Sequence, residues 1–286
     1  MTIEERCIPG ACPLHVELRG AAEAPALILV LGLGMQMREW PEDFLRALAQ
    51  SFRVICLDNR DSGRSGRCGP EPDPQAMSPE GLRDPAAYRL QDLAADVSRV
   101  ADALALKSYA VIGFSMGGMI AQLVAATDPR VRAMVQICSS GGEATLVTTP
   151  EAEARFTRTV QPFESAAAFL DWLAEDVAYF ATPGSLTEGE ARSIAAQMIA
   201  EGYTQGGFAR QRRAIALAGE RSALLRRITV PSLIIAGADD NCLPPESSVR
   251  AQALIPGSEL HILPGMGHAL DAPALDLVRA WLSERG

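Results

Sequence analysis

The sequence lacks any segment that suits a membrane or a secretory signal. No apolar run approaches the roughly 20 residues that a helix needs to cross a bilayer. The first six residues are acidic, whereas a signal peptide needs a basic region followed by an apolar one. These absences predict a cytoplasmic protein with no membrane partner.

Basic side chains are also outnumbered. The chain has 26 Lys and Arg against 35 Asp and Glu, which gives a formal net charge of -9. A phosphate backbone or an anionic membrane surface would favour clustered Lys and Arg. We therefore do not expect nucleic acid as a partner.

Cysteine and histidine are scarce. The six cysteines form no CxxC pair, and 286 residues are enough to bury a core without disulfides, so most cysteines are expected to be free thiols. Cys56 and Cys138 lie in apolar runs, where cysteine behaves as a small hydrophobic residue. The three histidines have no second ligand at metal spacing. The sequence thus predicts neither a metal nor an organic cofactor. It also contains no internal repeat.

What the sequence does contain is a regular alternation of strand-like and helix-like segments. Continuous apolar runs are typical of strands that are covered on both faces, and the helices between them have apolar residues at helical spacing. The alternation predicts an α/β protein with a mostly parallel central sheet that is covered by helices on both faces. The predicted strands are 14–18, 26–31, 53–57, 109–112, 133–138, 232–236 and 259–263, and the helices among them are 41–51, about 90–104, 116–126, 246–254 and 272–284.

Between about Glu151 and Leu225 the strand pattern stops. Helices are predicted over 151–160, 165–179, 187–201 and 208–218, with Pro and Gly at the junctions. We expect this block to form a helical cap, residues 145–225, inserted before the last two strands of a core formed by residues 1–144 and 226–286. Ligands of open α/β sheets bind outside the carboxyl ends of the strands, where such a cap would lie. The Gly-, Pro- and Asp-rich stretch 61–84 is predicted to be a long surface loop.

The most informative motif is Gly113-Phe-Ser115-Met-Gly117, which follows an apolar strand and opens a helix. In a nucleophile elbow, a sharp strand-to-helix turn exposes a serine to a base, and small residues at both ends keep the turn free of clashes. The GxSxG pattern is short, and its position between a predicted strand and a predicted helix gives it weight. Ser115 is therefore the candidate nucleophile.

A serine nucleophile needs a base and an acid that orients the base. His268 follows the last predicted strand, whereas His15 and His261 lie within strands and are expected to be structural or surface residues. Asp239 and Asp240 both follow the strand 232–236, and Glu143 is a more remote candidate. The order Ser, Asp, His along the chain is that of the α/β-hydrolases.

These segments together resemble the α/β-hydrolase superfamily, and within it the aclacinomycin methylesterase-like hydrolases of small esters. The resemblance covers nearly the whole chain and implies Asp240 as the triad acid, because it occupies that position in the family's Gly-x-x-Asp-x-x-x-Pro segment. Many relatives carry Gly where this chain has Asp61. The resemblance rests on Leu31-Gly-Leu-Gly34 with Trp40, on 58–65, on 113–117, on 237–244 and on Gly267-His268.

The segment at the end of the predicted strand 26–31 departs from the family. Many relatives carry His-Gly there, whereas this chain has Leu31-Gly32, so no imidazole is available and the hydrogen bonds that support the loop must differ. The resemblance implies an oxyanion hole formed by the backbone N–H groups of Leu33 and Met116.

The sequence therefore predicts an esterase that acts on a small to medium carboxylic ester through Ser115, His268 and Asp240 and an acyl-enzyme. Fold alone also allows an aminopeptidase, a carbon–carbon hydrolase, a cofactor-free perhydrolase or a ligand-binding receptor. No oligomeric state is indicated. Part of the cap is expected to line an apolar pocket, and the rest to attach the cap to the core. The apolar candidates are Phe163, Phe169, Leu170, Trp172, Leu173 and Phe180.

Overall fold

The computed structural model describes residues 3–69, 81, 87–144, 147–158 and 160–285. Its centre is an eight-stranded sheet with the order β1-β2-β4-β3-β5-β6-β7-β8. The pairs β1–β2 and β2–β4 are antiparallel, and all later pairs are parallel. The strands are β1 (Glu4–Ile8), β2 (Leu14–Arg19), β3 (Ala26–Val30), β4 (Arg53–Leu57), β5 (Tyr109–Phe114), β6 (Val131–Ile137), β7 (Ser232–Gly237) and β8 (Glu259–Leu263).

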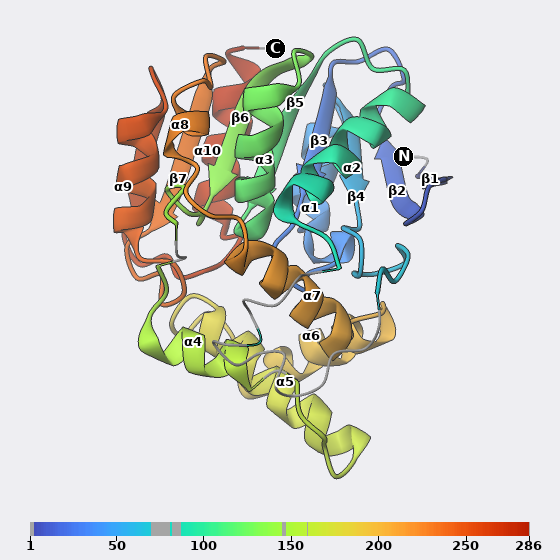
Figure 1. The fold of residues 1–286 in the computed structure, drawn as a ribbon, viewed down its shortest axis with the longest axis vertical. Helices are drawn as coiled ribbons and strands as arrows, with labels where there is room; N and C mark the ends of the chain where they lie inside the picture. Colours follow the sequence, from blue (N-terminus) through green and yellow to red (C-terminus); the bar gives the residue numbers. More distant parts are fainter. Residues whose placement is uncertain (1–2, 70–80, 82–86, 145–146, 159, 286) are drawn as a thin grey trace.

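Helices cover both faces of the sheet (Figure 1). Alternate side chains of β3 show why: Ile28 and Val30 join the apolar cluster under α2, α3 and α9, while Leu27 and Leu29 join the cluster under α1 and α10. A strand buried on both sides must be apolar throughout. These helices are α1 (Glu42–Leu48), α2 (Leu90–Ala103), α3 (Met116–Thr127), α9 (Pro245–Leu254) and α10 (Ala272–Ser283).

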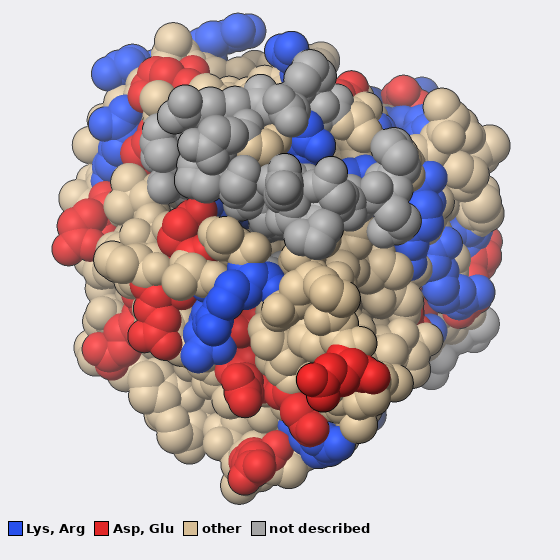
Figure 2. All heavy atoms as spheres, turned by 60° about the horizontal axis from the view of Figure 1, so that its bottom comes forward, with Lys and Arg blue, Asp and Glu red and all other residues tan. Residues whose placement is uncertain are grey.

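Of the helices between β6 and β7 in the sequence, α4–α7 gather at one end of the sheet, whereas the short α8 lies beside α3 and α9 (Figure 1). The outer face at this end carries both acidic and basic side chains (Figure 2). The helices are α4 (Pro150–Thr157), α5 (Ala166–Phe180), α6 (Glu188–Ala200), α7 (Gln205–Ala216) and the short α8 (Ser222–Leu225). We refer to α4–α7 as the cap; α8, which falls within the segment 145–225 that was predicted to be the cap, packs instead against α3 and α9.

The fold class is the predicted one, but several elements were not predicted. The edge strand β1, the 3₁₀ turn η1 (Met37–Glu39) and α8 are additional, and α7 begins three residues earlier than expected. The edge strand escaped prediction because four of its five residues are exposed and charged or polar. Most of the predicted loop 61–84 lies outside the described residues; its first part, 61–69, contains neither helix nor strand.

Most of the cysteines are free, as expected. Cys7, Cys56, Cys138 and Cys242 are free, and Cys56 and Cys138 are buried as predicted. Cys12 and Cys68, however, form a disulfide that the sequence did not suggest. The two cysteines meet because the chain after β4 folds back on the start of β2, where the Gly66 N–H donates to the carbonyl of Pro13 (2.8 Å).

Among the described residues, no helix combines the length and the apolar character that crossing a membrane would require.

Candidate active site

Ser115 occupies a strained turn between β5 and α3. Its backbone has φ 55° and ψ -120°, a region that residues with a side chain rarely adopt. A Cβ atom at Gly113 would lie 2.1 Å from the carbonyl oxygen of Gly117, and one at Gly117 would lie 2.0 Å from the carbonyl oxygen of Val30. The elbow thus requires glycine at both ends for a steric reason, and the turn directs Ser115 to the edge of the sheet.

His268 and Asp240 approach Ser115 from the loops that follow β8 and β7, at the carboxyl ends of the strands. The Nε2 atom of His268 lies 3.0 Å from Ser115 Oγ, and its Nδ1 atom lies 2.8 Å from Asp240 Oδ2. These contacts join residues that are 153 and 28 positions apart. The distances are those expected of a nucleophile, a base and an orienting acid.

The Asp240 carboxylate is buried and fully bonded. Its Oδ1 accepts the backbone N–H groups of Cys242 and Leu243, both at 2.8 Å, while Oδ2 faces His268. Burial raises the pKa of Asp240, but His268 and the two N–H groups lower it more, so the pKa lies below its usual value. Burial likewise lowers the pKa of His268, yet the Asp240 carboxylate raises it well above its ordinary value. The contact therefore favours an ionised Asp240 and raises the proton affinity of the His268 imidazole.

The other candidates from the sequence lie elsewhere. Asp239 is exposed, and Glu143 accepts the Gly141 N–H (2.8 Å) on another loop. His261 is exposed on β8. His15 is buried on β2, with its ring nitrogens 3.6 Å from carboxylate oxygens of Glu5 and Asp58. Of these residues and Asp240, only Asp240 is joined to His268 by a described contact.

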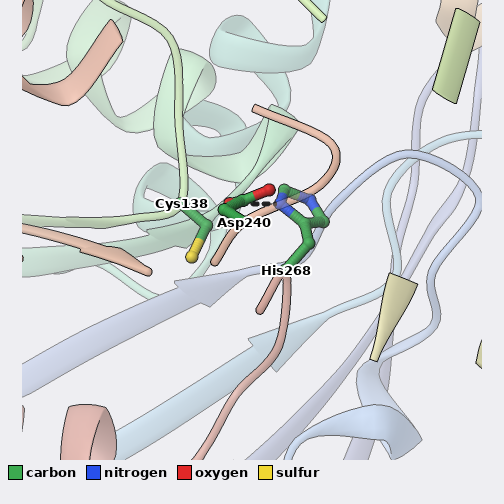
Figure 3. A group of neighbouring side chains, drawn as sticks. All are labelled: Cys138, Asp240 and His268. Atoms are coloured by element: carbon green, nitrogen blue, oxygen red, sulfur yellow. Dashed lines mark hydrogen bonds and ion pairs between the residues drawn. The ribbon is translucent and has the colours of Figure 1, made fainter. Parts of the chain in front are cut away.

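Cys138 lies beside the His268–Asp240 pair (Figure 3). One potential ligand atom from each of the three residues falls within 4.8 Å of the others. Burial and the nearby Asp240 carboxylate raise the pKa of the Cys138 thiol well above its ordinary value. Each of the three side chains already has a partner within the protein: the Cys138 thiol donates to the Gly267 carbonyl (3.8 Å), and His268 lies between Asp240 and Ser115.

The loop that follows β3, residues 31–37, is the one predicted to supply an oxyanion donor; we call it the oxyanion loop, and it lies against Ser115. A Cβ atom at Gly32 would be 3.0 Å from Ser115 Cβ, so the chain passes directly beside the elbow. Leu33 and Met116 both line the same cavity as Ser115 and His268. Met116 is the first residue of α3, where backbone N–H groups have no partner within the helix.

The cavity at Ser115 has a volume of about 670 Å³ and a largely apolar wall. Leu173 and Phe180 of the cap line it, as the sequence suggested. Within the described part of the chain, the other four apolar candidates are not among the lining residues. Three of these, Phe163, Phe169 and Trp172, instead pack against each other with ring centroids 5.1–6.1 Å apart.

Two residues near the site were missed by sequence reasoning. Asn59 donates to the carbonyl of Leu31 (3.0 Å), and Gln211 accepts the N–H of Gly34 (2.8 Å). Asn59 stands in the motif 58–65, which gave a signal, but Gln211 is one polar residue in a helix with several. Its burial could not be inferred from helical spacing.

The family model for the alpha/beta hydrolase fold matches residues 25–270. The chain therefore belongs to the alpha/beta hydrolase fold family. This match includes Ser115, Asp240 and His268.

Relatives and solved structures agree with this family. A putative carbamate hydrolase, RutD, of Variovorax paradoxus is 29% identical over 264 residues, covering 90% of each chain. The rhodomycin D methylesterase DnrP of Streptomyces peucetius is 29% identical over 278 residues, covering 87% of this chain and 86% of its own. The crystal structure of a hydrolase from Pseudomonas aeruginosa is 26% identical, with a TM-score of 0.72, over 98% of this chain and 94% of that one. The family and these relatives support a hydrolase as the class of enzyme.

Proposed function

We propose that this protein is a serine hydrolase that cleaves a small to medium carboxylic ester. Ser115 attacks the ester carbonyl while His268 takes the serine proton, and the leaving alcohol receives that proton from His268. Asp240 holds the imidazole and offsets its charge. Water, activated by the same histidine, then releases the acid from the acyl-enzyme. The N–H groups of Leu33 and Met116 stabilise the oxyanion of each tetrahedral intermediate.

One observation carries this proposal: the continuous contact from Ser115 Oγ through His268 to Asp240 Oδ2, at 3.0 and 2.8 Å. The apolar cavity beside it supports a substrate with an apolar body. The name of the methylesterase relative supports an ester as the bond that is cleaved.

Carbamate hydrolysis is a second candidate, favoured by the names of several relatives, of which one is as similar as the methylesterase. Both reactions use the same acyl transfer chemistry, so the contact from Ser115 through His268 to Asp240 supports either. We favour the ester because the name of the methylesterase relative specifies an ester and because the largely apolar cavity of about 670 Å³ suits a substrate with an apolar body.

The test combines labelling with a substrate panel. A fluorophosphonate should label Ser115 and no other serine, because only an activated hydroxyl reacts readily with it. Ser115→Ala should lose the label and reduce ester hydrolysis by several orders of magnitude, with an unchanged thermal melt. Methyl and longer-chain esters should be hydrolysed faster than simple carbamates of matched size. A label on another serine, or full activity in the folded Ser115→Ala variant, would refute the proposal.

A further inference from the structure

The oxyanion loop is held by hydrogen bonds from outside itself, at both ends and in the middle. At its start, the side chain of Asn59 donates to the Leu31 carbonyl (3.0 Å). At its end, the Asp58 carboxylate accepts the Met37 N–H (2.8 Å). Between them, the Gly34 N–H donates to Oε1 of Gln211 (2.8 Å). The first two residues follow β4 in the core, but Gln211 belongs to the cap helix α7.

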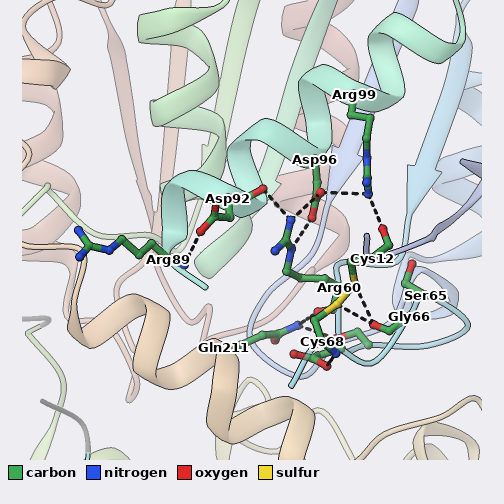
Figure 4. Close-up of polar contacts among 12 residues, drawn as sticks. Cys12, Arg60, Ser65, Gly66, Cys68, Arg89, Asp92, Asp96, Arg99 and Gln211 are labelled. Carbon is green, nitrogen blue, oxygen red and sulfur yellow. Dashed lines mark hydrogen bonds and ion pairs between the residues drawn. A yellow bond between two sulfur atoms is a disulfide. The ribbon is translucent and has the colours of Figure 1, made fainter. Parts of the chain in front are cut away.

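The Gln211 side chain joins three segments of the molecule. While its oxygen accepts from Gly34, its Nε2 donates to the Arg60 carbonyl (2.8 Å) and to the Ser62 hydroxyl (2.9 Å). Figure 4 shows Gln211 reaching from α7 to the loop that carries Arg60. The residue is fully buried, where an unbonded amide would be costly, so these three bonds fix the orientation of the amide.

The helix and the oxyanion loop are also in close steric contact. Gly34 has φ 73°, and a Cβ atom there would lie 2.9 Å from the ring of Phe208 in α7. A Cβ atom at Gly207 would lie 2.2 Å from the carbonyl oxygen of Asp61. Gly34 thus allows α7 to approach the oxyanion loop, and Gly207 allows it to approach the segment that follows β4. Because the contact at Gly34 is tight, a shift of α7 would be transmitted to the backbone beside Leu33.

We propose that Gln211 is a positioning residue for hydrolysis: by holding the Gly34 N–H, it sets the position of the neighbouring Leu33 N–H that faces the oxyanion. This inference rests on the proposed function, because it assumes that Leu33 stabilises an oxyanion. It also answers the departure at Leu31, where no imidazole can support the loop. The supporting bonds come instead from Asn59 in the core and from Gln211 in the cap.

Two variants of Gln211 test the role. Gln211→Leu removes all three bonds, and Gln211→Asn keeps an amide that is one methylene too short to span them. Removing an oxyanion donor costs 10²–10³ in kcat, and displacing one should cost part of this, so we expect kcat to fall about 10- to 100-fold. KM should stay within about threefold, as for an interaction made only in the transition state.

The inhibition constant of an aryl trifluoromethyl ketone provides a second measurement. If Gln211 affected only the stability of the fold, this constant would not change in the folded variants. The adduct of the ketone with Ser115 carries an oxyanion, so the inhibition constant should rise in parallel with the loss of kcat/KM. Gln122 is the matched control: it is a fully buried glutamine that donates to Gln136 and to the Ser140 carbonyl, away from the loop. Gln122→Leu and Gln122→Asn should lower the melting temperature but leave kcat and inhibition nearly unchanged.

The inference is overturned if folded Gln211 variants keep wild-type kcat and inhibition, or if the Gln122 variants lose as much. Should Gln211→Leu fail to fold, the milder Gln211→Asn decides by the same two measurements. Failure of the proposed function is distinguishable, because the wild-type protein itself would then neither hydrolyse esters nor react with the fluorophosphonate.

Discussion

The central strands and the outer cap helices differ in how strongly burial constrains them. Every residue of β3 and β7 is buried; β3 is an unbroken apolar run, and β7 is apolar after its first residue, Ser232. In α5, by contrast, only Leu173 and Ala174 of 15 residues are buried, although the helix is largely apolar. Burial on both faces therefore restricts the residues that the core strands can carry. Most of α5 is exposed or partly buried, so packing restricts its residues less.

The cap itself is not uniform. Nine of the twelve residues of α7 are buried, among them Arg210, Gln211 and Arg212, which are polar or charged. Arg210 forms an ion pair with Asp61 in the core (2.9 Å), and Gln211 holds the oxyanion loop. By its burial and its bonds, α7 behaves as part of the core, whereas most residues of α5 and α6 are exposed or partly buried. The cap therefore contains one helix that is fixed to the core and two that are more loosely packed.

The largest expected effect concerns the proposed triad acid, Asp240, which lies on a loop of the core after β7. Asp240→Asn should reduce kcat by about 10⁴-fold, because the histidine would be left in the wrong tautomer. Asp239→Asn, one position away and exposed, should cost little. Measuring kcat of both variants at neutral pH, with folding checked by thermal melts, decides the assignment. A large loss at Asp239 with a small one at Asp240 would reverse it, and modest losses at both would direct attention to Glu143.

The next test concerns the joint between α7 and the core. Asp61 binds Arg210 through both carboxylate oxygens, and both side chains are buried, so Arg210→Met should destabilise the fold by about 3–5 kcal/mol by leaving a buried carboxylate unpaired. Asp61 has φ 71°, which favours glycine, so adding Asp61→Gly to Arg210→Met should recover much of the loss. Denaturant unfolding measures both effects.

Asp171, which pairs with Arg192 on the outer cap, is the control for that experiment. Both partners are exposed, so Asp171→Asn should hardly move the unfolding midpoint. If Arg210→Met were equally mild, α7 would not be anchored as the structure indicates.

The sequence predicted the fold well because long-range burial leaves a local record in apolar runs and helical spacing. It also identified Ser115 and His268 as candidates, since an elbow and a short list of histidines are readable in one dimension. It could not reveal Gln211 or the disulfide between Cys12 and Cys68, because these contacts join segments 177 and 56 positions apart without any local motif. The choice between Asp239 and Asp240 depended on family resemblance. The two side chains are identical and adjacent, and they differ only in where they point: Asp240 faces His268, whereas Asp239 is exposed.

The last test compares the core with the outer cap directly by making the same substitution in both, and its Leu170 arm has a small expected effect. Leu29 in β3 is fully buried, so Leu29→Ala should cost about 2–5 kcal/mol through lost burial and a cavity that the packed sheet cannot close. Leu170 in α5 is only partly buried, so Leu170→Ala removes less surface from contact and leaves neighbours that can relax. We expect a loss of about 1 kcal/mol or less there, within the range of ordinary single substitutions. Urea unfolding of the two variants gives the difference, and equal losses would mean that α5 is as tightly constrained as the central sheet.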